Sequence, residues 1–370
     1  MLNVLHLHSG NLYGGIETIL VTLVEHAGET VRHDFVLAFD GRLRQELATR
    51  HASVEIIGPV RLSRPWTVRR ARRALASFLT RHHPDVCVCH SPWSMAVFGP
   101  TVRRARRHLV LCAHGDVQGA HWLQRLAGRV RPHAIVCNSA FTASGAARTY
   151  GSSIPCEVVM PPVSPPQPGS DAGESIRRAL GESTATVVIL MVARMESGKG
   201  HRVLLDAIGR MRTADRCSVW LVGGAQRPAE RRYVDALRQH AALTSVASRV
   251  RFLGERSDVR ALYAGADIYC QPNTTPDAFG ITFVEALYAG LPIVTSPMGG
   301  ALEIVDAACG AFARADDATA LAETLDELVE DEARRHRLGA AGPARATRLC
   351  DPTTQITQFH RALAAAVGDR

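Results

Sequence analysis

Short apolar runs of the kind found in buried strands alternate along this chain with segments of helical periodicity, and the alternation occurs in two blocks. The first block begins with LNVLHLH at residue 2, and the second begins with TVVILMV at residue 186. Between them, residues 161–183 are rich in proline, glycine and serine, which is typical of a connection between domains. A strand–helix–strand rhythm produces a mainly parallel sheet with helices on both faces. The pattern therefore predicts an α/β protein of two doubly wound domains in tandem.

The chain of 370 residues is long enough for two domains, since a domain usually takes about 100–200 residues. We expect an N-terminal domain over 1–165, a C-terminal domain over 166–350, and a closing helix over 351–370 that is able to pack back on the N-terminal domain. No apolar run approaches the ~18 residues that a membrane-spanning helix needs. The first residues form a strand-like alternation in place of a signal peptide, so we expect a cytoplasmic protein.

The cysteines predict core thiols and no metal centre. There are nine of them, an odd number, and most lie inside apolar strand-like runs. Cys87 and Cys89 have the wrong spacing for a zinc knuckle, and no second pair of ligands stands at a suitable interval. No Asp-x-Asp sequence occurs either. We therefore expect neither a metal ion nor another cofactor.

The excess of basic charge is confined to the N-terminal half. Residues 1–165 hold 19 arginines against 10 acidic residues, whereas the rest of the chain is nearly balanced. The arginines concentrate in Arg61–Arg81, where apolar residues recur at helical spacing, and in Arg103–Arg107. Such a helix has either a plainly solvated polar face or a surface that attracts an anionic membrane or an acidic acceptor. We do not expect nucleic acid as a partner, because no recognition motif accompanies the charge.

In open α/β sheets, ligands bind beyond the carboxyl ends of the strands, and three loops at such positions stand out. The first contains Gly14, Gly15 and Glu17 ahead of a helix. Paired glycines let the backbone approach a ligand closely, and the helix start offers free N–H groups to a phosphate. The spacing differs from GxGxxG and does not support a nicotinamide cofactor. A glycine turn without a ligand is the alternative.

The second loop follows TVVILMV and contains Arg194 and Lys199. Lys199 is the only lysine of the chain, and it stands between two glycines just before a helix. A compact ammonium group at a helix N-terminus can reach a diphosphate. A single lysine retained by chance is the alternative. The spacing is not that of a Walker P-loop.

The third loop and the helix after it contain Asp277 and Glu285. A helix that begins near Gly280 carries Glu285 in its first turns and has Asp277 in the preceding loop. Two carboxylates at a helix mouth suit the capture of sugar hydroxyls. Taken alone, Asp277 is equally well explained as a helix-capping residue.

The loops together resemble those of the retaining glycosyltransferases of family 4, which have the GT-B fold, two Rossmann-like domains facing each other across a cleft. The resemblance covers most of the chain and depends on the order of the motifs, since no single one is specific. The matching segments are Gly14-Gly15-x-Glu17, Ala193-Arg194-x(4)-Lys199-Gly200, Leu253-Gly254, Leu262-Tyr263-Ala264-x-Ala266-Asp267, Asp277-x(7)-Glu285-Ala286, Gly290-Leu291-Pro292 and Gly299-Gly300-x-x-Glu303.

The resemblance implies a nucleotide-sugar donor, UDP- or GDP-linked, held mostly by the C-terminal domain, and an acceptor on the N-terminal domain. In the family pattern, Arg194 and Lys199 match the diphosphate-binding pair, and Glu285 matches the ribose-binding glutamate. The expected substrate-binding residues are Gly14, Gly15, Glu17, Arg194, Lys199, Gly254, Phe279, Gly280, Ile281 and Glu285.

The expected catalytic residues are His114, Asp277, Arg194 and Lys199. His114 ends the strand-like run HLVLCA and matches a family position near the reacting sugar, although this chain has 16 histidines and a lone one is more often structural. Asp277 stands where the family usually has glutamate and is one methylene shorter. Asn138-Ser139 looks like a helix cap.

We therefore expect a retaining hexosyltransferase that moves a sugar onto the hydroxyl of a glycan, a lipid-linked molecule or a small molecule. No carboxylate is placed as a nucleophile, so same-face displacement is preferred, with Arg194 and Lys199 stabilising the charge on the departing phosphate. The alternatives are an epimerase or phosphorylase with the same fold, and a nucleotide-sugar-binding protein without catalysis. The arginine-rich segments add peripheral binding to the inner face of the membrane as a further possibility.

Overall fold

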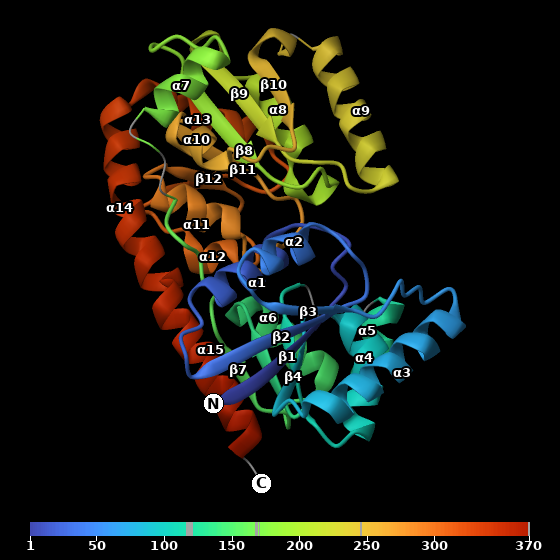
Figure 1. Cartoon of the computed structure of the whole chain (residues 1–370). Coiled ribbons are helices and arrows are strands. Elements are labelled where there is room, and N and C mark those ends of the chain that lie inside the picture. Colours follow the sequence, from blue (N-terminus) through green and yellow to red (C-terminus); the bar gives the residue numbers. More distant parts are fainter. Residues whose placement is uncertain (116–120, 167–168, 170, 245, 369–370) are drawn as a thin grey trace. The chain divides into compact units, whose positions relative to one another are not determined.

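The computed structural model describes residues 1–115, 121–166, 169, 171–244 and 246–368. The chain divides into two compact units, which we call unit 1 and unit 2 (Figure 1). Unit 1 comprises Met1–Ser164 and Cys350–Arg370, and unit 2 comprises Pro165–Leu349. Each unit contains one parallel sheet with helices packed against it, which confirms the predicted fold class of two Rossmann-like α/β domains.

The sheet of unit 1 has seven strands in the order β3-β2-β1-β4-β5-β6-β7, and every pairing is parallel. Its central strands are continuous apolar runs such as VCVC, because a parallel sheet is buried on both faces. The strands are β1 (Leu2–His8), β2 (Val31–Leu37), β3 (Ser53–Ile56), β4 (Val86–Cys89), β5 (His108–Ala113), β6 (Ala134–Cys137) and β7 (Cys156–Val158).

The helices of unit 1 cover both faces of this sheet. One core joins the sheet to α3, α4 and α5, and a second core lies between the sheet and α15. The predicted closing helix therefore packs within unit 1. The helices are α1 (Gly15–Glu25), α2 (Arg42–Ala48), α3 (Pro65–His82), α4 (Pro92–Arg104), α5 (Trp122–Gly128), α6 (Ala140–Tyr150) and α15 (Pro352–Gly368).

Side chains of β1 alternate between the two cores with the period of two that a strand imposes. Leu5 and Leu7 belong to the core under α3 and α4, whereas Val4 belongs to the core under α15. His6 and His8 share the parity of Val4, and both are almost fully buried. This alternation places two imidazoles of β1 on the face of the sheet that α15 covers.

The sheet of unit 2 has six parallel strands in the order β10-β9-β8-β11-β12-β13. The strands are β8 (Val187–Val192), β9 (Cys217–Val222), β10 (Val250–Gly254), β11 (Ile268–Gln271), β12 (Ile293–Thr295) and β13 (Gly310–Phe312). The helices are α7 (Ala172–Ala179), α8 (His201–Ile208), α9 (Pro228–Leu243), α10 (Val259–Ala264), α11 (Ile281–Tyr288), α12 (Ala301–Ile304), α13 (Ala318–Glu330) and α14 (Glu332–Cys350).

The cysteines behave largely as the sequence predicts. All nine are free thiols, and all except Cys156 are buried. Among the described residues, no helix is at once long enough and apolar enough to cross a bilayer. Ser139 is the N-cap of α6, and its side chain accepts a hydrogen bond from Thr142 N, which confirms the expected cap.

Candidate active site

The loop after β8 packs tightly against the loop after β11. Gly200 has a φ of +83°, and a Cβ atom on it would lie 1.8 Å from the carbonyl oxygen of Pro272. Only glycine fits at this position. The amides of Thr274 and Thr275 both donate to the carbonyl oxygen of Gly198, at 3.0 and 3.3 Å. Backbone contacts therefore fix the position of Lys199 relative to the β11 loop.

Lys199 forms an ion pair across these two loops. Its Nζ lies 2.5 Å from Oδ2 of Asp277, and the two side chains are only 18% and 23% exposed. The side chain of Lys199 is therefore mostly covered and has a carboxylate partner. The sequence provides no signal for this pairing, because the two residues are 78 positions apart.

Asp277 does not cap the helix that follows it. Helix α11 begins at Ile281, and the residue at its N-cap is Gly280, with a φ of +104°. The carboxylate of Asp277 instead accepts from the amide of Ala278 with Oδ1 and from Lys199 with Oδ2. The capping alternative is therefore wrong for this residue.

Arg194 also has a carboxylate partner, which the sequence analysis missed. Its guanidinium lies 2.8 Å from Oε1 of Glu196, and its side chain is 47% exposed. Glu196 stands only two positions away, so the local sequence contained the signal. The two predicted diphosphate-binding cations thus each lie against one carboxylate, on the loops that follow β8 and β11.

Glu285 lies on α11 and accepts a hydrogen bond from the hydroxyl of Tyr263, at 3.0 Å. Burial raises the pKa of Glu285 to about 7, against the opposing effects of the Tyr263 hydrogen bond and of Arg260. Tyr263 is 2% exposed and is a residue that sequence reasoning did not include in the site. Tyr263 lies inside the family-like segment Leu262–Asp267, and that position was the sequence signal that could have included it.

The other predicted residues of unit 2 lie near the same edge of its sheet. Gly254 ends β10 with a φ of +68°, and its carbonyl oxygen accepts from the amide of Gly223. Phe279 is buried and Ile281 is partly buried, on either side of Gly280. The structure therefore gathers Arg194, Lys199, Gly254, Asp277, Phe279, Gly280, Ile281 and Glu285 on loops and helix starts beyond the carboxyl ends of β8, β10 and β11.

In unit 1, Glu17 supports the glycine loop from within. Its Oε2 accepts from the amide of Gly14 at 2.9 Å, and its Oε1 lies 2.7 Å from Nε2 of His8. Burial raises the pKa of Glu17, but the hydrogen bonds from His8 and Gly14 outweigh burial and lower it. Both carboxylate oxygens are engaged, so this geometry favours a positioning role over the substrate contact that was expected. Gly14 and Gly15 lie at the start of α1.

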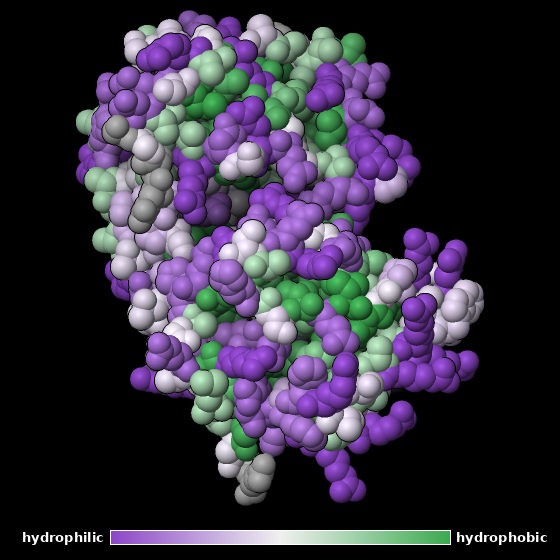
Figure 2. Space-filling model, in the orientation of Figure 1, coloured by the Kyte–Doolittle hydropathy of each residue, from purple (hydrophilic) through white to green (hydrophobic). Residues whose placement is uncertain are grey.

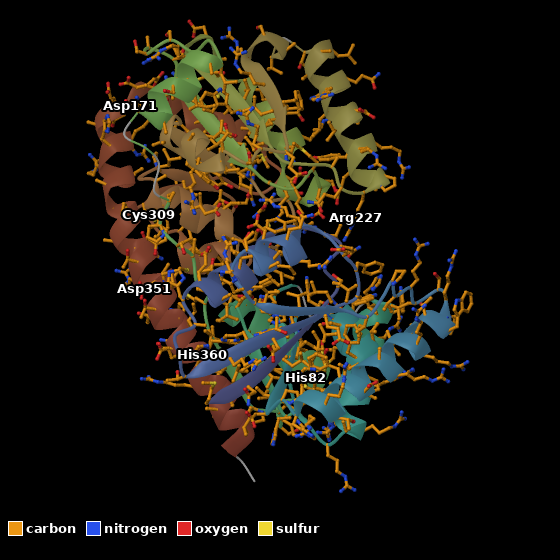
Figure 3. The ribbon with its side chains drawn as sticks, in the orientation of Figure 1. His82, Asp171, Arg227, Cys309, Asp351 and His360 are labelled. Carbon is orange, nitrogen blue, oxygen red and sulfur yellow. The ribbon has the colours of Figure 1, made fainter. Side chains whose placement is uncertain are left out.

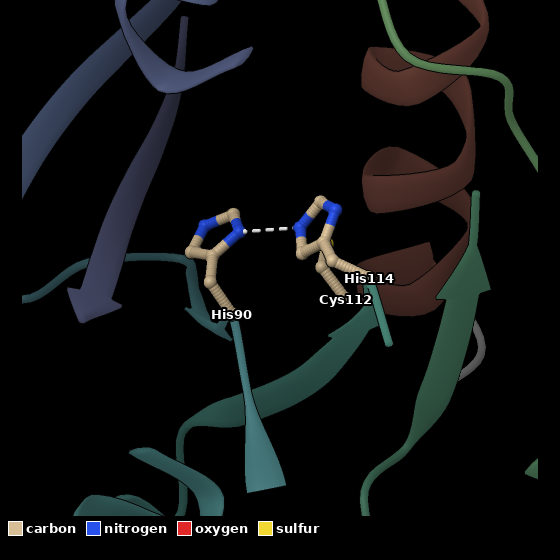
Figure 4. A group of neighbouring side chains, drawn as sticks. All are labelled: His90, Cys112 and His114. Carbon is tan, nitrogen blue, oxygen red and sulfur yellow. Dashed lines mark hydrogen bonds between the residues drawn. The ribbon is translucent and has the colours of Figure 1, made fainter. Parts of the chain in front are cut away.

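His114 directly follows β5 and is held by a second histidine (Figure 4). Its Nε2 lies 3.1 Å from Nδ1 of His90, whereas its own Nδ1 is buried and has no hydrogen-bond partner among the described residues. Burial lowers the pKa of His114 to about 4. The imidazole is therefore neutral near pH 7 and offers one nitrogen for a further interaction.

His90, Cys112 and His114 are the one group among the described residues whose histidine, cysteine or acidic ligand atoms could jointly hold a metal ion. These atoms lie within 4.8 Å of one another (Figure 4). However, both ring nitrogens of His90 are already hydrogen-bonded to other imidazoles, and burial raises the pKa of the Cys112 thiol far above neutrality. A metal ion bound here would have to break a hydrogen bond of His90 and displace the proton of the Cys112 thiol. Metal independence stays a prediction.

Comparison with known proteins assigns both halves of the chain. Residues 13–165 match the family described as Glycosyltransferase Family 4, and residues 173–345 match Glycosyl transferases group 1. The chain belongs to the family 4 glycosyltransferases. The predicted family is thereby confirmed, and its N-terminal and C-terminal parts fall on unit 1 and unit 2.

The curated relatives of this glycosyltransferase include proteins named as mannosyltransferases. A GDP-mannose-dependent monoacylated alpha-(1-6)-phosphatidylinositol monomannoside mannosyltransferase of Corynebacterium glutamicum is 34% identical over 176 residues, which are 45% of this chain and 44% of that protein. This chain thus aligns with less than half the length of that relative. A GDP-mannose-dependent alpha-(1-6)-phosphatidylinositol monomannoside mannosyltransferase of Mycolicibacterium smegmatis is 26% identical over 352 residues, which are 89% of each protein.

Solved structures agree on the fold of this glycosyltransferase. Anabaena HepE in complex with UDP and glucose superposes with a TM-score of 0.88 at 23% identity, covering 99% of this chain and 100% of that one. WaaG, a glycosyltransferase involved in lipopolysaccharide biosynthesis, has a TM-score of 0.73 at 18% identity, over 99% and 100% of the two chains. At these identities the likeness establishes the GT-B fold alone.

Proposed function

We propose that this chain is a retaining glycosyltransferase that moves a hexose from a UDP- or GDP-linked donor to a hydroxyl acceptor. The observation that carries the proposal is the Lys199–Asp277 ion pair, which joins the loops after β8 and β11 within a family 4 chain. It supports a site in which a cation and a carboxylate act on one ligand. A diphosphate would meet the ammonium, and the carboxylate would then accept from sugar hydroxyls.

Departure of the nucleoside diphosphate is the step that this site is suited to assist. Negative charge grows on the distal phosphate as its bond to the anomeric carbon breaks. Lys199 and Arg194 are cations on the same loop, and groups positioned in advance where charge develops lower the barrier most effectively. No metal ion is needed for this role, and same-face attack lets the departing phosphate take the acceptor proton.

Glu285 and His114 complete the proposed donor contacts. The carboxylate of Glu285, once ionised, can accept from two ribose hydroxyls. His114 is neutral and offers Nδ1 to a hydroxyl or to the reacting sugar. These assignments follow the family pattern residue by residue, and the geometry within each unit supports them.

We further propose that unit 1 binds an anionic membrane surface or an acidic lipid-linked acceptor through α3. Helix α3 buries Val68, Ala71, Leu75 and Phe78 and exposes Arg69, Arg70 and Arg73. Trp66, in its first turn, is 64% exposed. Hydrophilic side chains project from this part of unit 1 in Figure 2. Arg72 is different, since its guanidinium donates to the carbonyl oxygens of Ala96 and Val97.

A donor screen tests the proposal directly. The purified chain is incubated with UDP- and GDP-linked hexoses, and thermal unfolding and release of free nucleoside diphosphate are measured. We expect one nucleotide class to raise the unfolding temperature and one sugar of that class to be hydrolysed slowly without an acceptor. Stabilisation without any turnover, even with lipid and glycan acceptors, would identify a binding protein. Epimerised sugar in the absence of acceptor would identify an epimerase.

A further inference from the structure

Five histidines of unit 1 form one continuous chain of hydrogen-bonded imidazoles. His90 Nε2 lies 2.8 Å from His6 Nδ1, and His6 Nε2 lies 2.8 Å from His33 Nδ1. His33 Nε2 lies 3.1 Å from His360 Nε2, and His90 Nδ1 lies 3.1 Å from His114 Nε2. The chain therefore runs from His114 to His360 through three rings that use both of their nitrogens.

The fold builds this chain across the sheet. His33, His6, His90 and His114 lie on or directly after β2, β1, β4 and β5, which are neighbours in that order. His360 comes from α15, which packs over the same face, and it is labelled in Figure 3. His6 and His90 are almost fully buried, whereas His360 is partly exposed. One end of the chain thus lies near the molecular surface, and the other is the candidate catalytic histidine.

The protonation of such a chain has only two arrangements when every ring is neutral. Each neutral ring carries one proton, and each of the four links needs one proton between its two nitrogens. In the first arrangement, His6, His33, His90 and His114 all carry the proton on Nδ1, so His114 Nδ1 is a donor. In the second, all four carry it on Nε2, and His114 Nδ1 is an acceptor. The tautomer of His114 is therefore tied to the hydrogen bond made at His360.

We propose that these five histidines form a proton relay that connects His114 with solvent at α15 and sets which tautomer His114 presents. A proton that binds His114 Nδ1 displaces the Nε2 proton toward His90. The displacement repeats through His6 and His33, and His360 releases one proton from Nδ1. One proton enters and one leaves, so five protons remain on five rings.

The role that we assign to this relay in sugar transfer rests on the proposed function. Same-face transfer moves one proton from the acceptor hydroxyl onto the departing phosphate. That phosphate would then give the proton to His114 Nδ1, and the relay would release one proton to solvent at His360. Among the described residues, the titratable groups beside the histidines are His8, which is paired with Glu17, and Cys112. Burial lowers the pKa of His33 to about 3 and that of His114 to about 4, in keeping with neutral rings.

Two opposite substitutions at the outer end test the relay. In His360→Lys the ammonium can only donate, which forces His33 and the inner rings into the Nδ1–H tautomer. In His360→Glu the carboxylate can only accept, which forces them into the Nε2–H tautomer. The ¹⁵N chemical shifts of the His114 ring, measured at pH 8 in labelled protein, report the tautomer. We expect opposite His114 tautomers in the two variants. The same His114 tautomer in both would overturn the proposal.

Ala365, exposed on the same helix, provides the matched control. Ala365→Lys and Ala365→Glu introduce the same charges, and we expect neither to change the His114 tautomer. A change of tautomer in these variants would attribute the effect to charge alone and contradict the relay.

A kinetic experiment tests the part of the relay in sugar transfer. With the donor found in the screen, kcat of the two His360 variants should differ at least about tenfold, since proton transfer contributes a factor of about 10²–10⁴ to the rate. Tautomer reversal with equal kcat would overturn the relay's part in transfer. If no donor is turned over by the unaltered chain, the proposed function fails, and the tautomers alone decide the relay.

Discussion

Lys199 Nζ lies 2.5 Å from Asp277 Oδ2, and the pair joins the loop after β8 to the loop after β11. The sequence suggested separate tasks for the two residues, diphosphate binding for Lys199 and a sugar contact for Asp277. The ion pair couples the two residues. The carboxylate holds the ammonium group in place, and the ammonium group limits where the carboxylate can point. Changes at either residue should therefore be felt at the other.

The coupling between these two residues should appear in a double-mutant cycle. We expect Lys199→Ala and Asp277→Ala each to lower the free energy of unfolding by about 1–3 kcal/mol, because each leaves a partly buried polar group without its partner. The double variant should be less destabilised than the sum, with a coupling of about 0.5–3 kcal/mol. The exposed Arg44–Asp40 pair is the control, with an expected coupling below about 1 kcal/mol. Additive effects at Lys199 and Asp277 would show that the pair is not maintained in solution.

Asp277 should affect turnover more than nucleotide binding. We expect Asp277→Ala to reduce kcat strongly while leaving the Kd for the nucleoside diphosphate within a few-fold, because the nucleotide keeps Arg194 and Glu285. Asp277→Glu restores the carboxylate usual in the family and should retain activity or change the preferred donor sugar. Steady-state kinetics and calorimetry separate the two effects. Unchanged kcat in Asp277→Ala would remove this residue from the reacting site.

Glu285 should make the stability of unit 2 depend on pH. Burial raises its pKa from 4.5 to about 7, so the folded state binds a proton more tightly than the unfolded state does. This contribution is fully present below about pH 4.5 and is lost as the pH rises through about 7. Glu285→Gln should remove it, and the difference in unfolding free energy between the two proteins should change by about 1–3 kcal/mol from pH 4 to pH 8. Parallel stability curves would mean that Glu285 is not perturbed.

Divalent metal should be dispensable. We expect donor hydrolysis and transfer to persist in EDTA, because Arg194 and Lys199 supply the positive charge that the departing diphosphate needs. Loss of turnover in EDTA and its return with magnesium or manganese would contradict this account of the site.

Helix α3 should confer salt-sensitive binding to anionic vesicles. Each arginine near such a surface contributes about 1 kcal/mol, so replacing Arg69, Arg70 and Arg73 by glutamate should weaken binding to phosphatidylserine-containing vesicles at least about 100-fold. Arg231→Glu with Arg232→Glu, on exposed positions of α9, is the matched control and should change binding little. Flotation of the vesicles measures the bound fraction. A protein that stays in solution with every vesicle would leave α3 as a solvated helix face.

The fold was predictable because its strands are continuous apolar runs and its loops are marked by glycine and proline. The same local rules predicted the Ser139 cap and the amphipathic face of α3. Contacts between distant segments were not predictable in this way. The Lys199–Asp277 pair depends on how closely two loops approach, which Gly200 permits through its left-handed backbone.

The histidine chain shows the same limit at the candidate site. His6 and His8 at alternate positions of one buried strand, and histidines directly after two other strands, were visible signals. The hydrogen bonds between these histidines became apparent only from the order of the strands and the packing of α15. His33 and His360, for example, are separated by 327 positions in the sequence. Sequence patterns thus predicted which loops carry chemistry, whereas the partner of each side chain required the fold.

The most direct test of the account is the turnover of Lys199 variants at saturating donor. We expect Lys199→Ala to lower kcat by a factor of about 10²–10³, the usual effect of removing one positioned electrostatic group. Lys199→Arg should recover only part of the activity, because a planar guanidinium replaces a compact ammonium and the two are not interchangeable at a phosphate site. Ala365→Lys, far from these loops in the sequence, should leave kcat unchanged. Wild-type kcat in both Lys199 variants would contradict the claim that this residue stabilises the departing diphosphate.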